Sequence, residues 1–331
     1  MKQKTLTVFL IALFAIIIAS SEEFDYDHQG SDWTGECASG RAQSPIAISP
    51  ANTVCDESQL FNLYFTPGSQ TFTVVDTGES LKATTTSSTL YATATTGLFT
   101  GYEALQFHFH APSEHTINEK HMDLEMHFVH SITSDFSSRG ETTQTLAVVG
   151  IFFEVDERAE VNPFIEAMNF ANIDTTGVPR SIDLNEILLK QIPTPIQYYT
   201  YQGSLTTPPC AESVNWYVIS TPLKIKKSQL KAITDRYAEN EDFADGNGNN
   251  RKVVPLNGRV VKRGGMDECI VIAEEAKGVT VSDAGMAGIV IGCLFLGAAL
   301  AAFAFFFLRL AQSKKIISNG IPNKISVVVK E

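Results

Sequence analysis

Two segments of the chain alternate polar and apolar side chains and carry histidines among the polar ones, and this pattern constrains the fold and the chemistry more than any other feature. In residues 106–110, Gln or His alternates with Phe, and residues 121–130 alternate polar and apolar side chains in the same way. In a β-strand such alternation puts His108 and His110 on one face and the phenylalanines on the other. A second, neighbouring strand would add His127 to the same face. The pattern therefore predicts three imidazoles directed at one point, above an apolar core.

Three neutral imidazoles around one point suit a divalent transition metal, above all zinc. They leave the fourth tetrahedral position of Zn2+ open to water, as in a catalytic zinc site. Gln106 and Glu125 precede His108 and His127 by two residues on the same faces, where each can accept the ring N–H that the metal does not use. The sequence thus supplies ligands together with groups that orient them. The other histidines are expected to be structural or exposed: His28, His115, His121 and His130.

The middle of the chain has the pattern of a β-rich domain. Short alternating or apolar runs, separated by Gly, Pro, Ser and Asn, predict strands at residues 71–75, 105–110, 122–130, 145–153 and 214–220. Helical patterns cover residues 161–171 and 227–239. We expect a mainly β or α+β fold, with a large, mostly antiparallel twisted central sheet, short peripheral helices and one C-terminal transmembrane helix.

Several motifs, in this order along the chain, resemble those of the α-carbonic anhydrases. They are residues 43–46, 106–110, 113–116, 125–129, 199–210 with Trp216, and 255–259. The likeness covers about residues 26–262. It implies a zinc lyase that hydrates CO2 reversibly to bicarbonate and a proton by means of a zinc-bound hydroxide, with His108, His110 and His127 as zinc ligands. The alternative is a catalytically inactive, carbonic-anhydrase-like recognition module at the cell surface.

The resemblance also implies roles for other residues around the metal. Thr206 would accept a hydrogen bond from the hydroxide and donate its own to Glu114, which orients the attacking oxygen. Thr207 would help to hold bicarbonate, and the backbone carbonyl of Asn249 would orient the His110 ring. CO2 offers little to hydrogen-bond, so it would rest against an apolar wall formed by Val129, Val148, Leu205 and Trp216.

Two positions depart from the family pattern. Fast members carry a histidine that relays protons from the cavity to solvent, and alignment places this position at Gln70, whose amide does not titrate. We therefore expect proton transfer to limit turnover, and turnover to rise with the concentration of an imidazole-type buffer. Position 111 is Ala, where the family often has Trp, so packing beside His110 would be looser. Tyr26 aligns with a family tyrosine near the active-site waters.

The two ends of the chain differ from the middle and predict a membrane anchor. Residues 1–21 combine two lysines, an apolar run and small residues, which is the order of a secretory signal peptide; an uncleaved anchor is the alternative. Residues 285–308 hold no charge and are long enough to cross a bilayer. Basic residues at 309–315 follow at once, which indicates the cytoplasmic side. A GPI signal is the rival interpretation, but a polar tail continues to Glu331.

These features predict a single-pass type I membrane protein whose catalytic domain is extracellular or luminal. The expected divisions are a signal peptide (1–21), a catalytic domain (22–275), a juxtamembrane linker (276–284), a transmembrane helix (285–308) and a cytoplasmic tail (309–331). The net charge is −12; because the signal carries +2 and the tail +4, the outer domain holds −18. A domain this acidic excludes nucleic acid as a partner.

Four of the five cysteines lie in the expected outer domain. An oxidising compartment would join them in disulfides, for which three connectivities exist. The resemblance implies a bond between Cys37 and Cys210, which is typical of extracellular members. Cys55 and Cys269 would then pair with each other, or Cys269 would cross-link two chains.

A homodimer is the further partner that the sequence leaves open. Gly288 and Gly292 form a GxxxG motif within the expected membrane helix, and such small residues let two helices approach closely. The cross-link through Cys269 is the other route to a dimer.

Overall fold

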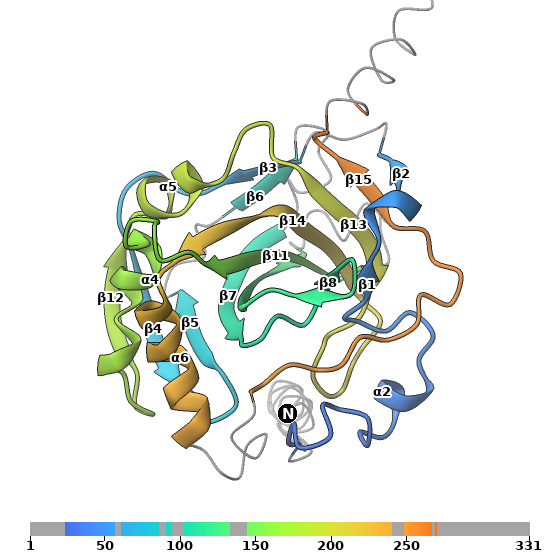
Figure 1. The fold of residues 1–331 in the computed structure, drawn as a ribbon, viewed down its shortest axis with the longest axis horizontal. Coiled ribbons are helices and arrows are strands. Elements are labelled where there is room, and N and C mark those ends of the chain that lie inside the picture. The colour runs from blue at the N-terminus through green and yellow to red at the C-terminus, as the bar shows by residue number, and fades with distance from the viewer. Residues whose placement is uncertain are drawn as a thin grey trace, which may run out of the picture. The chain divides into compact units, whose positions relative to one another are not determined.

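The computed structural model describes residues 24–56, 61–85, 91–94, 102–132, 144–239, 248–266 and 269. These residues form one large sheet, one small sheet and a few short helices (Figure 1), so the expected sheet-dominated fold class is confirmed. Within these ranges no helix is long and apolar enough to cross a membrane. The expected signal peptide (1–21) and membrane helix (285–308) lie outside the described residues.

The large sheet has twelve strands. Ten of them lie side by side in the order β12 (Val178–Ile182), β4 (Gln70–Asp76), β5 (Leu81–Thr85), β7 (Tyr102–His110), β10 (Leu124–Ile132), β11 (Leu146–Val155), β14 (Val214–Ile225), β13 (Tyr198–Gly203), β15 (Lys262–Gly264) and β2 (Val54–Cys55). The other two are β6 (Tyr91–Ala94), which pairs with β7, and β3 (Phe61–Tyr64), which pairs with β6. The pairs β11–β14 and β15–β2 are parallel, and the remaining described pairs of this sheet are antiparallel.

The small elements surround this sheet. The second sheet consists of β1 (Ala47–Ile48), β8 (Thr116–Ile117) and β9 (Lys120–His121). The α-helices are α2 (Glu36–Ser39), α4 (Pro163–Met168), α5 (Leu184–Ile187) and α6 (Lys227–Glu239), and the 3-10 helices are η1 (Pro50–Asn52), η2 (Phe170–Asn172) and η3 (Leu189–Gln191). Figure 1 shows α4, α5 and α6 beside the end of the sheet that carries β12, β4 and β5.

The helix expected at residues 161–171 is shorter than predicted, whereas α6 has the predicted bounds. The Asn162 side chain accepts the backbone N–H groups of Phe164 and Ile165 and so caps α4, and Pro163 occupies its first position, as is usual at helix starts. Asn169 then adopts a left-handed conformation with φ 50°, which ends the α-helix before η2 begins.

The strand expected to begin at residue 122 begins two residues later, at Leu124. The backbone N–H of Met122 donates to Ser113 Oγ (2.9 Å), and its carbonyl accepts from the Ser113 N–H (3.0 Å). The Asp123 carboxylate accepts the backbone N–H of Val155 at 2.7 Å. Because these contacts replace ladder hydrogen bonds, His121 belongs to β9 and is separated from β10.

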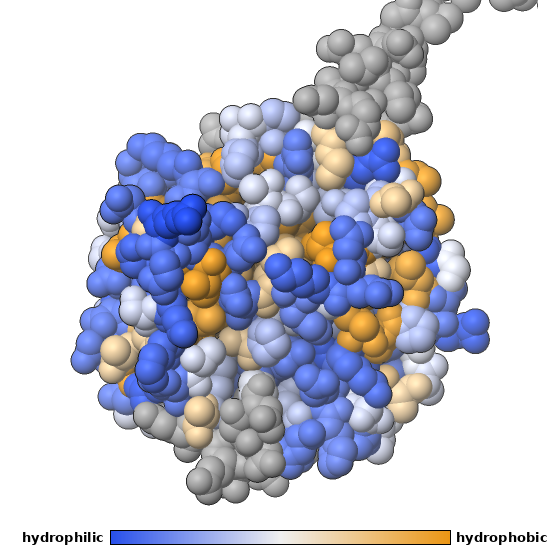
Figure 2. All heavy atoms as spheres, in the orientation of Figure 1, coloured by the Kyte–Doolittle hydropathy of each residue, from blue (hydrophilic) through white to orange (hydrophobic). Residues whose placement is uncertain are grey.

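The core confirms the alternation predicted for the two histidine-bearing strands. Phe107 and Phe109 of β7 and Phe128 of β10 are at most 1% exposed and belong to the main apolar cluster. The ring of Phe107 lies 5.5 Å from Phe128 and 5.6 Å from Phe164 of α4, between centroids. Val129 faces a second apolar cluster on the other side of the sheet. On the surface seen in Figure 2, hydrophobic side chains occur as separate patches among hydrophilic ones.

One buried histidine of β10 makes the stability of the fold depend on pH. His130 is 0% exposed, and its Nδ1 lies 3.3 Å from the Ala147 carbonyl. Burial lowers the pKa of His130 from 6.5 to about 4, although hydrogen bonds to the Ala147 and Phe128 backbone oppose the shift. Between these two pKa values the unfolded chain binds a proton that the folded chain does not, so stability falls as pH falls.

We expect this group to remove about 3 kcal/mol of stability between pH 7 and pH 4. The variant His130→Gln should therefore lose less stability than the wild type over that range, whatever its stability at pH 7. Urea unfolding at several pH values measures the difference. His28→Gln, at an exposed position, is the control and should follow the wild type. A His130→Gln profile parallel to that of the wild type would contradict the prediction.

Candidate metal centre

The register between β7 and β10 brings the three predicted histidines together. His127 lies directly opposite His108, and Glu125 lies opposite His110. One ring nitrogen from each of His108, His110 and His127 can be chosen so that all three lie within 4.8 Å of one another. His110 and His127 are each 1% exposed. Two neighbouring strands thus hold three imidazoles around one point.

An acceptor faces one nitrogen of each ring and thereby fixes its tautomer. The three contacts are His108 Nδ1 with Gln106 Oε1 (3.0 Å), His110 Nδ1 with the Asn249 carbonyl (2.8 Å) and His127 Nε2 with Glu125 Oε1 (2.9 Å). A neutral imidazole donates through one nitrogen and keeps a lone pair on the other. The lone pairs therefore lie on Nε2 of His108, Nε2 of His110 and Nδ1 of His127.

Two buried atoms at this point have no hydrogen-bond partner, His110 Nε2 and Glu114 Oε2. Glu114 Oε2 lies 3.6 Å from His110 Nε2 and 3.8 Å from His127 Nδ1. Buried polar atoms without partners are rare, and three imidazole nitrogens open to one point are the donor set of a catalytic zinc ion. The residues present therefore fit zinc.

The surroundings of His108 and His110 favour the neutral rings that metal binding requires. Burial, and after it repulsion from His110 and His127, holds the pKa of His108 well below its usual range. Burial likewise lowers the pKa of His110, although the nearby Glu114 carboxylate opposes the shift.

The Glu125 carboxylate makes hydrogen bonds with two histidine rings and two backbone amides. Its Oε1 lies 2.8 Å from His115 Nδ1 and 2.9 Å from His127 Nε2, and its Oε2 accepts the N–H groups of Glu114 and His115 at 2.9 Å. Burial raises the pKa of Glu125, but His115 and His127 outweigh burial and hold it well below its usual range. His115 also lies 2.6 Å from the Tyr201 hydroxyl. Its part in this network was not predicted, because no strand alternation links it to the metal face.

The expected hydrogen bond from Thr206 to Glu114 is not formed in the described structure. Glu114 Oε1 accepts the backbone N–H of Arg251 at 2.8 Å, while Oε2 is directed toward the histidine nitrogens and has no partner. Thr206 is 5% exposed. The buried Arg251, which the sequence did not single out, therefore fixes the orientation of the Glu114 carboxylate.

The four residues expected to form an apolar wall lie together. Val129 is opposite Val148 in the sheet, and Val148 is opposite Trp216; all three belong to one buried cluster, against which Leu205 packs. The rings of Trp216 and His127 are 4.7 Å apart between centroids. The wall therefore borders the metal centre directly.

A cavity of about 170 Å3 opens over the histidines and is lined by His108, His110 and Thr207 among others. Gln70, which alignment placed at the proton-relay position, is not among its described lining residues. Gln70 lies in β4 opposite Ile182 of β12, whereas it is β5 that pairs with β7. The residues that enter the cavity instead include Glu79, just before β5.

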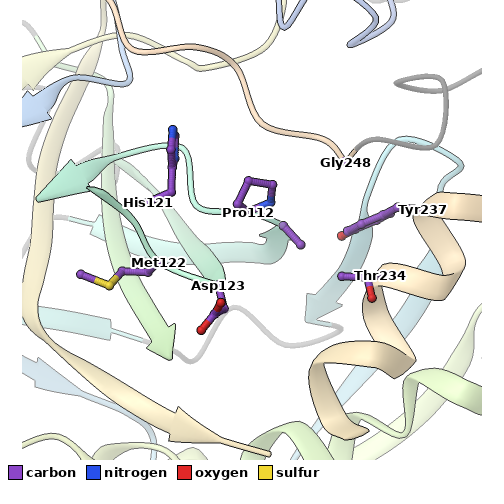
Figure 3. A pocket seen from close by; sticks show the side chains of 8 residues that line it. Pro112, His121, Met122, Asp123, Thr234, Tyr237 and Gly248 are labelled. Atoms are coloured by element: carbon purple, nitrogen blue, oxygen red, sulfur yellow. The ribbon is translucent and has the colours of Figure 1, made fainter. Parts of the chain in front are cut away.

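A second pocket, of about 310 Å3, lies between the segment that follows His110 and helix α6 (Figure 3). Ala111 and Pro112 line one side, and Thr234 and Tyr237 of α6 line the other. This space agrees with the looser packing expected beside His110 where Ala replaces the frequent Trp.

Two disulfide bonds fix the segments around the centre. Cys37 is joined to Cys210, whose backbone N–H donates to the Thr207 carbonyl at 2.9 Å, so the bond anchors the loop that carries Thr207. Cys55 is joined to Cys269. Because Cys269 is bonded within its own chain, the alternative of a cross-link between two chains through Cys269 is not supported.

The chain is similar to known carbonic anhydrases in sequence and in fold. A family model for eukaryotic-type carbonic anhydrases matches residues 28–264. A carbonic anhydrase of Klebsiella pneumoniae is 34% identical over 229 residues, 68% of this chain and 81% of the relative. Carbonic anhydrase 7 of Mus musculus is 33% identical over 242 residues, and the match covers 68% of this chain and 89% of the length of the mouse protein. The solved structure of carbonic anhydrase Cah3 from Chlamydomonas reinhardtii in complex with acetazolamide aligns with a TM-score of 0.58 and 28% identity, over 74% of this chain and 98% of that one. The chain belongs to the eukaryotic-type carbonic anhydrase family.

Proposed function

We propose that this chain is a zinc-dependent carbonic anhydrase that converts CO2 and water reversibly into bicarbonate and a proton. The observation that carries the proposal is the convergence of three histidine nitrogens within 4.8 Å, each made a lone-pair donor by an acceptor on the other side of its ring. The inactive recognition module remains the alternative function. An intact set of ligands and orienting groups favours the enzyme, because a module without catalysis has no use for it.

In the proposed mechanism the chain holds the metal and aims the reactants. The ligands are His108, His110 and His127, oriented by Gln106, Glu125 and the Asn249 carbonyl. When bound, zinc would act as a Lewis acid and would make water a strong nucleophile at neutral pH. The three neutral rings match this task because they add no negative charge that would weaken the Lewis acid.

Glu114 and Thr206 are the proposed groups that orient the reacting water. Glu114 Oε2 is buried at the centre without a partner, and Arg251 fixes the other oxygen of the carboxylate. This Oε2 can therefore accept the hydroxyl hydrogen of Thr206, which leaves the Thr206 oxygen to accept from water. Thr207 lines the cavity and is the proposed partner of bicarbonate.

CO2 is proposed to lie against the apolar wall of Val129, Val148, Leu205 and Trp216. Val129 and Val148 are 6% and 2% exposed, so little water competes for this surface. A wall of this kind holds a nonpolar molecule beside the metal without a hydrogen bond. The Trp216 indole is fixed by its donation to the Ser204 carbonyl at 3.0 Å.

We propose that the enzyme is a type I membrane protein that works outside the cytosol. Two disulfides in the described part of the chain are typical of an oxidising compartment. The signal-like residues 1–21, the uncharged residues 285–308 and the basic residues after them give the orientation. Residues 22–275 would then form the outer domain, 276–284 the linker and 309–331 the cytoplasmic tail, and Gly288 and Gly292 would offer a contact between two copies.

Replacing one ligand tests the metal and the activity together. We expect the purified full-length wild type to hold one zinc per chain and to hydrate CO2 in a stopped-flow assay. His110→Asn should lose zinc and lower activity about a thousandfold or more, because metal activation is worth several kcal/mol. His121→Asn, at an exposed histidine of β9, is the matched control and should keep both. Zinc-loaded, folded wild type without activity would favour the recognition module.

The membrane proposal is tested by topology in cells. With an epitope tag after residue 331, external protease should remove the catalytic domain from intact cells and leave the tag protected. A chain that stops at residue 284 should appear in the medium, because it lacks the apolar segment. A tag that protease reaches from outside, or a shortened chain that stays with the membranes, would count against the proposed orientation.

A further inference from the structure

Hydration of CO2 releases one proton per turnover. In this protein the proton would be released at the buried centre formed by His108, His110 and His127. The His110 and His127 rings are each 1% exposed, so bulk buffer does not reach them freely. Proton transfer over hydrogen bonds requires a donor and an acceptor in contact, directly or through water. A titratable side chain between the centre and the solvent would therefore speed the reaction. This reasoning rests on the proposed function.

The described residues that line the cavity include three titratable side chains besides the histidine ligands, namely Tyr26, Glu79 and Lys82. Burial, followed by the charges of Glu114 and Glu79, raises the pKa of Tyr26 well above its usual value, so Tyr26 keeps its proton at neutral pH. The ammonium group of Lys82 has no acceptor. Of the three, only Glu79 carries a carboxyl group that can accept a proton as the carboxylate and donate it again as the acid.

The position of Glu79 is fixed by the turn between β4 and β5. The Thr77 N–H donates to the Ser80 carbonyl at 3.0 Å, and the Gly78 N–H donates to Asp76 Oδ1 at 3.0 Å. Gly78 has φ 84°, a left-handed conformation that suits glycine. The turn therefore has a defined shape and presents Glu79 at the cavity.

The same turn is joined to the metal centre through Asn249. The Asn249 side chain donates to the Glu79 carbonyl at 3.1 Å, and its own carbonyl faces His110 Nδ1 at 2.8 Å. One residue thus holds both the His110 ring and the backbone of Glu79. The Glu79 side chain remains exposed to solvent while lining the cavity, so it has access to both sides.

We infer that Glu79 is the residue through which protons leave this cavity. A carboxylate oxygen of Glu79 accepts the proton that water in the cavity passes on, which gives the neutral carboxylic acid. The acid then donates the same proton to a buffer base in the solvent, and the carboxylate is restored for the next turnover. The role that alignment placed at Gln70 belongs to a residue nine positions further along the chain.

The surroundings of Glu79 support this role. Burial raises the pKa of Glu79, and the positive charge of Lys82 on β5 opposes the shift. Tyr26, from the N-terminal segment, faces the same cavity and stays neutral. A relay works best when its pKa lies near the operating pH, and a raised carboxyl pKa moves Glu79 in that direction.

Exchange of 18O between CO2, bicarbonate and water at chemical equilibrium tests the inference on the full-length zinc enzyme. Mass spectrometry of this exchange yields two rates: the interconversion of CO2 and bicarbonate, and the release of labelled water, which requires a proton. With Glu79→Gln we expect unchanged interconversion and about tenfold or more slower water release in dilute buffer. Added imidazole should restore the release. Glu119→Gln, an exposed acid in the turn between β8 and β9, is the control and should leave both rates unchanged.

Two further measurements separate a relay from a structural role. Glu79→His should sustain water release with a pH profile moved toward the pKa of a histidine. In 13C NMR of side-chain carboxyls, the signal that is lost in Glu79→Gln should have a pKa above the usual range of a glutamate, also in the metal-free protein. The inference would be overturned if Glu79→Gln left the release of labelled water unaffected, or if Glu79→His left the pH profile unshifted. In either case, interconversion of CO2 and bicarbonate by the wild type would still support the proposed function. A wild type without interconversion would instead overturn the proposed function, and the relay with it.

Discussion

The register between β7 and β10 is the constraint on which the rest of this structure depends. His127 faces His108 across the ladder, and a slip by one residue would turn the histidines into the core and the phenylalanines into the cavity. Phe107 and Phe128 pack against each other beneath the sheet, so the apolar face opposes such a slip. The same alternation that builds the core therefore sets the positions of the metal ligands.

Hydrogen bonds from distant parts of the chain then orient the rings that the register brings together. Glu125 holds His127 and is itself held by His115 and two backbone amides. Asn249, 139 residues after His110, holds the third ring. A neutral imidazole offers its lone pair only on the nitrogen that does not donate. The acceptors thus make the site selective for a cation.

The sequence predicts the parts of this site that depend on local alternation. The three ligands, Gln106 and Glu125 follow from period-two patterns within single strands, and the core on the opposite face follows with them. Non-local pairing is not encoded in such patterns. Which strand of the β4–β5 hairpin pairs with β7 decides which of its residues line the cavity, and the described lining residues include Glu79 but not Gln70. Similarly, the break before Leu124 depends on Ser113, and the orientation of Glu114 depends on Arg251.

Anomalous diffraction at the zinc absorption edge, from crystals of the zinc-loaded protein, tests the central claim most directly. We expect one peak about 2.0–2.1 Å from Nε2 of His108, Nε2 of His110 and Nδ1 of His127. His115, Glu125 and His127 form a second group whose ligand atoms lie within 4.8 Å of one another. A peak between those three residues, or three histidine rings with no peak between them, would contradict the account.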